Sequence, residues 1–140
     1  MKRKKYILTL PLKNDIREIA MLPDFVEAAV QQSKMDPSFT AALNLALEEA
    51  VANVIQYAYP AGASGIIEVD AILDGHSLSF VISDSGKPFD PTAKPDVDIT
   101  ASAEDRPIGG LGIHLVRQIM DTVHYERKDG MNILTITKII

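Results

Sequence analysis

The sequence predicts a two-layer α/β sandwich of the α+β type, in which helices cover one face of a mostly antiparallel sheet. A first strand is followed by two segments whose apolar residues recur at helical spacing. Two pairs of strand-like segments come later, joined by Asp74 with Gly75 and by Asp129 with Gly130, and Asp-Gly favours hairpin turns. Because hairpin partners run antiparallel, the sheet is expected to be mostly antiparallel.

The first half of the chain is expected to hold one strand and two helices. The strand should cover 4–12, and a helical segment should cover 15–32. A second, longer helix should run to about Tyr59, with Asp36 or Ser38 as a cap near its start. It should end there because a cluster of proline and glycine residues follows.

The second half should hold two hairpins separated by a long loop. The hairpin strands are expected over 65–75 with 76–86, and over 121–130 with 131–140. The segment 87–112 is rich in proline and aspartate, has no periodicity and is too long for a passive connection in a small domain. We therefore expect a mobile functional loop there, followed by a short helix over 112–121.

Composition narrows the class of protein. The 140 residues, 46% hydrophobic and 24% charged, predict one domain over 1–140 with one core. No segment is long enough to span a bilayer, and the basic start runs into Pro11 and Asp15, so we expect neither a membrane partner nor a signal peptide. The absence of cysteine excludes disulfides and thiolate metal sites and suits the cytoplasm. A net charge of −5 argues against nucleic acid as a partner.

Glu49 and Asn53 form the first candidate motif, on the long predicted helix. They are four residues apart, so their side chains share one face. The pair has two interpretations. It is either a solvated polar stripe, which is what most helical glutamate and asparagine residues form, or a carboxylate and an amide placed together for chemistry. The spacing alone favours the stripe.

Asp84 lies at the centre of the second motif, directly after an apolar strand. The segment is compatible with a strand that ends in an Asp/Gly turn, with Pro88 and Pro91 stiffening the exit. A lone carboxylate at the end of a sheet is costly unless something binds it, and this cost favours a ligand site.

The third motif is a cluster of three glycines within four residues, at Gly109, Gly110 and Gly112, just before the short helix. Glycine lets backbone N–H groups approach an anion at a helix N-terminus, where the helix dipole also favours negative charge. The alternative is a flexible hinge without a ligand.

Together and in this order, the three motifs resemble the nucleotide-binding boxes of the GHKL ATPases, which share the Bergerat fold. The matching residues are Glu49 and Asn53 for ExxxN, Asp84, Gly86, Pro88 and Phe89 for DxGxPF, and Gly110, Leu111 and Gly112 for GxG. The resemblance spans nearly the whole chain. Within the superfamily the sequence looks like the small anti-sigma factor serine/threonine kinases, because of the extended forms EEAVANVIQYAYP, DSGKPFDP and GGLGIHLVRQIMDTVHY.

The resemblance implies roles for the pair on the long helix. In the family the asparagine oxygen ligates a magnesium ion that bridges the nucleotide phosphates, so Asn53 is the implied magnesium ligand. The preceding glutamate is the general base, a role that falls to Glu49. Asn53 is expected on a wet face rather than in the core. Glu48 points about 100° away and is expected to be a surface or structural residue.

The resemblance also implies how the rest of ATP is held. Asp84 should accept a hydrogen bond from the exocyclic amine of adenine, with Gly86 letting the base lie close to the backbone. The segment 90–108 would be the lid over the triphosphate, with Arg106 at the γ-phosphate. The implied backbone donors to the phosphates are Gly110, Leu111, Gly112 and Ile113.

Two positions depart from the family pattern. Tyr57 stands where many relatives have histidine, and Asn132 stands where a threonine beside the adenine is common. Neither change removes a phosphate or magnesium ligand. They bear on nucleotide affinity rather than on binding itself.

The resemblance implies an ATP- and magnesium-dependent serine/threonine kinase. Its protein substrate would be a small anti-sigma factor antagonist of the STAS type, and it would sequester a sigma factor when that antagonist is absent. A rival interpretation is a nucleotide-dependent binding module with little or no kinase activity, against which Glu49 argues. A third is an ATP-hydrolysing conformational machine, for which no transducer domain is visible, and a fourth is a degenerate domain without nucleotide. The sequence leaves the oligomeric state open, and the first strand with the following helix offers a surface for a homodimer.

Overall fold

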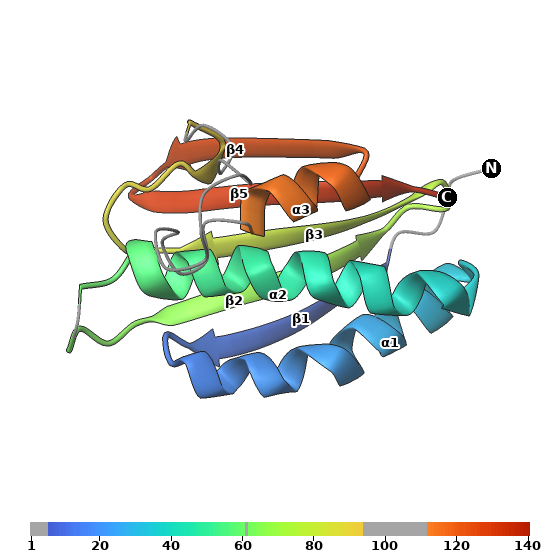
Figure 1. Ribbon diagram of the computed structural model, residues 1–140, viewed down its shortest axis with the longest axis horizontal. Coiled ribbons are helices and arrows are strands. Elements are labelled where there is room, and N and C mark those ends of the chain that lie inside the picture. Colours follow the sequence, from blue (N-terminus) through green and yellow to red (C-terminus); the bar gives the residue numbers. More distant parts are fainter. Residues whose placement is uncertain (1–5, 61, 94–111) are drawn as a thin grey trace, which may run out of the picture.

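The computed structural model describes residues 6–60, 62–93 and 112–140, which build two layers (Figure 1). The strands are β1 (Tyr6–Lys13), β2 (Ile66–Leu73), β3 (Ser77–Asp84), β4 (Thr122–Lys128) and β5 (Met131–Ile139). The helices are α1 (Leu22–Ser33), α2 (Thr40–Tyr57) and α3 (Gly112–Ile119), with short 3₁₀ helices η1 (Ile16–Met21), η2 (Pro37–Phe39) and η3 (Pro91–Ala93).

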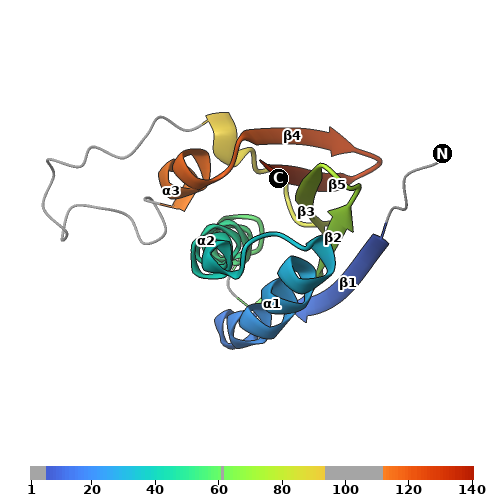
Figure 2. The same ribbon diagram turned by 90° about the vertical axis from the view of Figure 1, so that its right-hand side faces the viewer.

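The sheet has five antiparallel strands in the order β1-β2-β3-β5-β4. Figure 2 shows that α1, α2 and α3 all lie on one side of it. The predicted α+β sandwich is therefore confirmed. None of the helices in the described ranges has the length and hydropathy needed to cross a bilayer.

The two predicted hairpins differ in their turns. In the β4–β5 hairpin Lys128 pairs with Met131, so Asp129 and Gly130 alone form the turn, with φ of 54° and 79°. Positive φ at both positions is what a two-residue type I′ turn requires. In the β2–β3 hairpin Leu73 pairs with Leu78, so the turn between the strands is longer. Within this turn the side chain of Asp74 accepts hydrogen bonds from the backbone amides of His76 and Ser77.

The predicted helix over 15–32 is two elements in the structure. Asp15 caps η1 by accepting from the Arg17 amide, and α1 begins only at Leu22, with Pro23 in its first turn. Proline has no N–H to donate and suits a first turn, so it marks a new helix start. Asp36, rather than Ser38, provides the predicted cap, and it caps η2 just before α2.

The core lies between the sheet and the helices. In β3 the buried residues alternate with more exposed ones, as expected for a strand with one covered face. The inward-facing series is Leu78, Phe80, Ile82 and Asp84. Because Asp84 keeps the phase of the three core residues before it, its carboxylate points to the helix side. A carboxylate therefore lies at the boundary between the sheet and the helices.

Candidate nucleotide-binding site

Asp84 combines deep burial with an unused acceptor. Its side chain is 1% exposed, and its Oδ1 accepts from the amide N of Gly86 at 2.8 Å and from Nδ2 of Asn132 at 3.0 Å. Its Oδ2 is buried and has no hydrogen-bond partner among the residues that the structure describes. Burial raises the pKa of the Asp84 carboxyl, while the bonds from Asn132 and Gly86 lower it. An unpaired buried carboxylate oxygen is costly, so Oδ2 is suited to a donor supplied by a ligand.

Gly86 brings the exit of β3 against the end of α2. A Cβ atom at this position would overlap the carbonyl oxygen of Ala58, and the next residue, Lys87, donates its amide to that oxygen at 2.9 Å. The expected role of Gly86 in admitting the base stays a prediction. The contact with α2 is a separate reason for glycine that the motif alone did not indicate.

The rest of the DxGxPF motif forms a loop beside this contact. Pro88 is exposed, whereas Phe89 is half-buried and stacks on Tyr57 of α2, with ring centroids 5.3 Å apart. Tyr57, one of the two departures from the family pattern, thus holds the loop to the helix. The motif's loop and the C-terminal end of α2 form one packed unit.

Glu49 and Asn53 lie on α2, as predicted, but their environments differ. Asn53 is only 5% exposed, so the expectation that it lies on a wet face is wrong. The burial of a residue on α2 depends on what packs over the helix, and the sequence of α2 alone does not contain that information. Glu49 is half-buried, and its pKa is raised first by burial and then by the charge of Glu48. A raised pKa brings a carboxylate closer to the range that favours general-base catalysis.

Glu48 has the structural role that the sequence suggested. Its Oε1 accepts from Nδ2 of Asn44, one turn earlier on α2, at 2.9 Å. The two adjacent glutamates therefore have different environments. Glu48 is hydrogen-bonded within the helix, whereas Glu49 faces a different direction.

Asn132 is the residue that sequence reasoning undervalued. It is 4% exposed and lies opposite Asp84 in the β3–β5 ladder. Its amide contacts Asp84, the loop after β3 and Tyr125 of β4. The pairing of β3 with β5 would have revealed it, but neither predicted hairpin contains that pairing.

Several predicted site residues fall outside the described ranges. Arg106, Gly110, Leu111 and the lid from 94 to 108 are among them. Gly112 begins α3, and the side chain of Ile113 is buried in the core. The predicted phosphate contacts of all these residues stay predictions.

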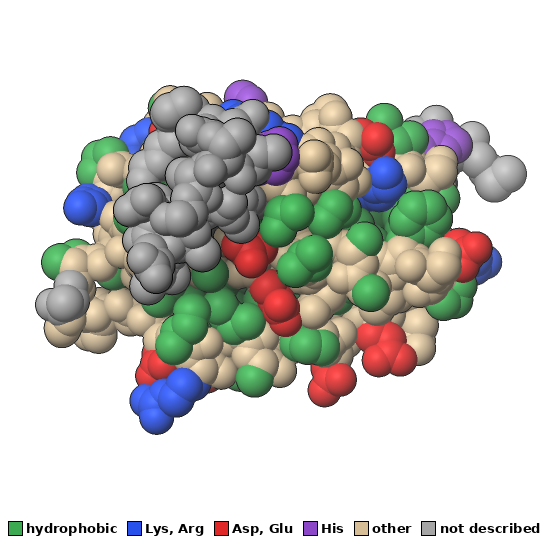
Figure 3. All heavy atoms as spheres, in the orientation of Figure 1, with side chains coloured by type: hydrophobic (Ala, Val, Ile, Leu, Met, Phe, Trp, Pro, Cys, Tyr) green, Lys and Arg blue, Asp and Glu red, His purple; other side chains and the backbone are tan. Residues whose placement is uncertain are grey.

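The helical face around Glu49 offers negative rather than positive charge. Helix α2 contains two glutamates and no lysine or arginine, and α1 contains Asp24 and Glu27 and likewise no basic residue. Figure 3 shows acidic and hydrophobic side chains together on this side of the molecule. A triphosphate placed here would need a cation, and the amide oxygen of Asn53 is the kind of hard donor that magnesium accepts.

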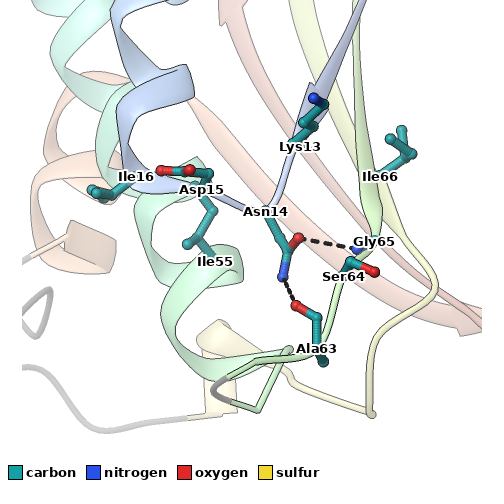
Figure 4. Close-up of a pocket in the computed structure, with 9 residues that line it drawn as sticks. All are labelled: Lys13, Asn14, Asp15, Ile16, Ile55, Ala63, Ser64, Gly65 and Ile66. Atoms are coloured by element: carbon teal, nitrogen blue, oxygen red, sulfur yellow. Dashed lines mark hydrogen bonds between the residues drawn. The ribbon is translucent and has the colours of Figure 1, made fainter.

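A separate hollow of about 730 Å³ lies where β1 ends beside the α2–β2 connection (Figure 4). Asn14 closes one side of it by donating to the carbonyl of Ala63 and accepting from the amide of Gly65. The lining residues are Lys13, Asn14, Asp15, Ile16, Ile55, Ala63, Ser64, Gly65 and Ile66. It contains none of the predicted site residues.

The fold and the three motifs define the class of protein. The chain belongs to the histidine kinase-like ATPase domain family, whose model matches residues 12–138. It is 33% identical over 95 residues to the serine/threonine-protein kinase BtrW of Bordetella bronchiseptica, covering 68% of this chain and 67% of that protein. It is 32% identical over 96 residues to the serine-protein kinase RsbW of Listeria monocytogenes, covering 66% and 61%.

Solved structures agree on the fold. The RsbU and RsbW domains of a Mycobacterium tuberculosis protein match 96% of this chain and 32% of that chain, with a TM-score of 0.66 at 18% identity. A histidine kinase domain from Erythrobacter litoralis matches 86% and 59%, with a TM-score of 0.53 at 16% identity. The predicted membership in the GHKL superfamily and the predicted likeness to serine kinases are confirmed. The aligned segments span only about two thirds of the curated kinases' own length.

Proposed function

We propose that this protein binds ATP with magnesium and transfers the γ-phosphoryl group to a serine or threonine hydroxyl of a partner protein. The buried, unpartnered Oδ2 of Asp84 is the observation that carries the proposal. It lies at the motif where this family of ATPases has its adenine-binding aspartate. The relatives named above are protein kinases that act on serine or threonine.

The base end of the site is formed by β3 and the loop that follows it. Asp84 Oδ2 is available to accept a hydrogen bond from the exocyclic amine of adenine, which would satisfy an atom that the described residues leave unpaired. Gly86 and the stacked pair of Phe89 and Tyr57 hold the loop against α2. The packing of this loop against α2 favours a base subsite that exists before the nucleotide arrives.

The phosphate end is formed by α2 and the segment that leads into α3. Asn53 would hold the magnesium ion through its side-chain oxygen, and the ion, when bound, neutralises charge on the phosphates. The backbone from Gly110 to Ile113 and the guanidinium of Arg106 would bind phosphate oxygens. Since α2 has no basic side chain of its own, neutralisation must come from these other sources.

Glu49 would act on the incoming hydroxyl. The hydroxyl oxygen attacks the γ-phosphorus, Glu49 accepts the hydroxyl proton, and ADP leaves with the electrons of the broken P–O bond. Burial and the neighbouring Glu48 raise the pKa of Glu49, which strengthens it as a base once it is ionised.

The substrate we infer is a small anti-sigma factor antagonist of the STAS type. In its absence the protein would hold a sigma factor, and both activities would take place in the cytoplasm. This assignment is supported by the relatives named RsbW and BtrW and by the extended forms of the three motifs. A homodimer through β1 and the helix that follows it belongs to the same proposal.

The test compares Glu49→Gln with the matched control Glu48→Gln, the same substitution one residue earlier. Phosphoryl transfer from radiolabelled ATP to candidate antagonists is measured, with ATP affinity determined on the same samples. Glu49→Gln should bind ATP nearly as well as the wild type, because the amide is almost isosteric, but slow transfer by roughly 10²-fold or more. Glu48→Gln should transfer at close to the wild-type rate.

Two results would contradict the proposal. Undiminished transfer by Glu49→Gln would remove Glu49 from the role of base. A wild-type protein that binds ATP but phosphorylates none of several antagonist candidates would favour the nucleotide-dependent binding module.

A further inference from the structure

Asn132 has every hydrogen-bonding position of its side chain filled. A primary amide donates two hydrogen bonds and accepts two. Its Nδ2 donates to Oδ1 of Asp84 at 3.0 Å and to the carbonyl of Lys87 at 2.9 Å. Its Oδ1 accepts from the amide of Phe89 at 3.1 Å and from the hydroxyl of Tyr125 at 2.6 Å. A side chain saturated in this way and 4% exposed is fixed in one orientation.

The identity of the partners also fixes which end of the amide points where. The carbonyl of Lys87 can only accept, and the amide of Phe89 can only donate. Exchanging the oxygen and nitrogen of Asn132 would set N–H against N–H and oxygen against oxygen. Threonine, with one hydroxyl, has too few hydrogen-bonding positions for these four partners. Aspartate would place a second carboxylate beside Asp84.

The consequence for Asp84 is that only one of its oxygens faces a ligand. Oδ1 is engaged by Gly86 and Asn132, so the carboxylate cannot rotate without breaking both bonds. Oδ2 is left as an acceptor to which no group in the described part of the chain donates. A ligand group at this point must therefore donate, as an exocyclic amine does, whereas a carbonyl would be repelled.

We propose that Asn132 is the positioning residue of the base subsite, holding Asp84 and the 87–89 loop so that the site selects an amino-purine over an oxo-purine. The inference rests on the proposed function for its ligand. Asn132 itself would not hydrogen-bond to the base, because its four positions are used within the protein. It joins β5 to β3, to the loop after β3 and, through Tyr125, to β4.

The pKa of Asp84 is a measurement that separates a positioning role of Asn132 from a purely structural one. Arg127 of β4 lowers the pKa of Asp84 by its charge, and Tyr59 and Tyr125 also lie close enough to interact with the carboxylate. Asn132 lowers the same pKa by its hydrogen bond, against the upward effect of burial. Loss of the Asn132 amide should therefore raise the pKa of Asp84 in the protein without nucleotide.

The experiment uses Asn132→Leu, which removes all four bonds and keeps the branched shape of the side chain, and Asn132→Thr, which keeps one hydroxyl. Tyr125→Phe is the matched control, because it removes one donor to Asn132 and leaves the bond to Asp84 in place. Affinities for ATP and GTP are measured, and the Asp84 carboxyl is titrated by carbon-13 NMR without nucleotide. Folding of each variant is checked by circular dichroism.

Asn132→Leu should weaken ATP binding and reduce the preference for ATP over GTP, each by about 10-fold or more, as expected for loss of a bond to a charged group. Asn132→Thr should lie between it and the wild type, and Tyr125→Phe should keep the preference within about threefold. The Asp84 pKa should rise in the two Asn132 variants only. If Asn132→Leu does not fold, the same affinities and the same titration of Asp84 are compared between Asn132→Thr and the wild type.

A folded Asn132 variant with unchanged base preference and unchanged Asp84 titration would overturn the positioning role. A wild-type protein that binds neither nucleotide would refute the proposed function instead. The titration of Asp84, made without nucleotide, separates these two failures.

Discussion

Replacing Asp84 by asparagine should weaken nucleotide binding without destabilising the protein. The new amide can keep its oxygen at the Oδ1 position, where Gly86 and Asn132 donate. Its NH₂ group then occupies the position of Oδ2, the atom that has no partner within residues 6–60, 62–93 and 112–140. The substitution therefore leaves the internal bonds intact and reverses the polarity of the one atom that we assign to the ligand.

The effect on stability follows from the raised pKa of Asp84. Burial lifts this pKa above the ordinary value of 3.8, so the folded protein binds the proton more tightly than the unfolded chain. Stability therefore falls as the pH rises from 3.8 through the raised pKa, and the ionised carboxylate is a cost at neutral pH. Asp84→Asn removes that charge, so its melting temperature at neutral pH should equal or exceed that of the wild type.

The effect on binding has the opposite sign. A hydrogen bond to an ionised acceptor contributes about 1.5–3 kcal/mol, and each 1.4 kcal/mol is about tenfold in affinity. Loss of the bond from the exocyclic amine should therefore weaken ATP binding by roughly 10- to 100-fold. A donor facing a donor adds to this loss.

Calorimetric titration with ATP and GTP, together with thermal unfolding without nucleotide, measures both effects on one preparation. Asp70→Asn is the matched control, because Asp70 accepts from Thr9 on β1 and alternates with the inward-facing residues of β2. It should leave ATP affinity unchanged. If Asp84→Asn bound ATP within about twofold of the wild type, the assignment of Oδ2 to the base would be wrong. A large fall in melting temperature would refute the argument from burial.

Three further outcomes are expected. Asn53→Ala should weaken ATP binding by about 10-fold or more with magnesium but little without it. Because Asn53 is buried, the substitution should also lower the melting temperature. Equal losses of affinity with and without magnesium would contradict the ligand role. Gly86→Ala should cost about 1–3 kcal/mol of unfolding free energy in urea denaturation, since its Cβ would overlap the Ala58 carbonyl, and an unchanged midpoint would refute this. ATP affinity should fall as the pH is lowered through the raised pKa of Asp84, whereas Asp84→Asn should lack this dependence.

The elements of the fold were largely predictable because their signals are local. Asp129 and Gly130 form the turn that their sequence favours, and the alternation in β3 is visible in the sequence. The split of the first helix at Pro23 was missed because the apolar spacing continues across it. Proline indicates a boundary only when its missing N–H is weighed against that spacing.

The site was predictable in its residue types but not in its surroundings. Asp84 was singled out as a costly carboxylate, and its unpaired Oδ2 agrees with that reasoning. The burial of Asn53 depends on tertiary packing around α2, which the periodicity of α2 does not contain. The bonds of Asn132 depend on β5 lying beside β3, a pairing between strands that are far apart in the sequence.

The hydrogen bond from the amide of Lys87 to the carbonyl of Ala58 fixes the spacing between the two ends of the proposed site, at Asp84 and at Asn53. In the proposed function, base recognition would come from the sheet layer and metal binding from α2, and this backbone contact joins the two. Asn53 lies five residues before Ala58, which is about 7.5 Å along the helix axis. One residue inserted between them would move Asn53 by about 1.5 Å and turn it by about 100° relative to the contact. Every residue of both motifs would then be present, yet the two halves would no longer face the same nucleotide.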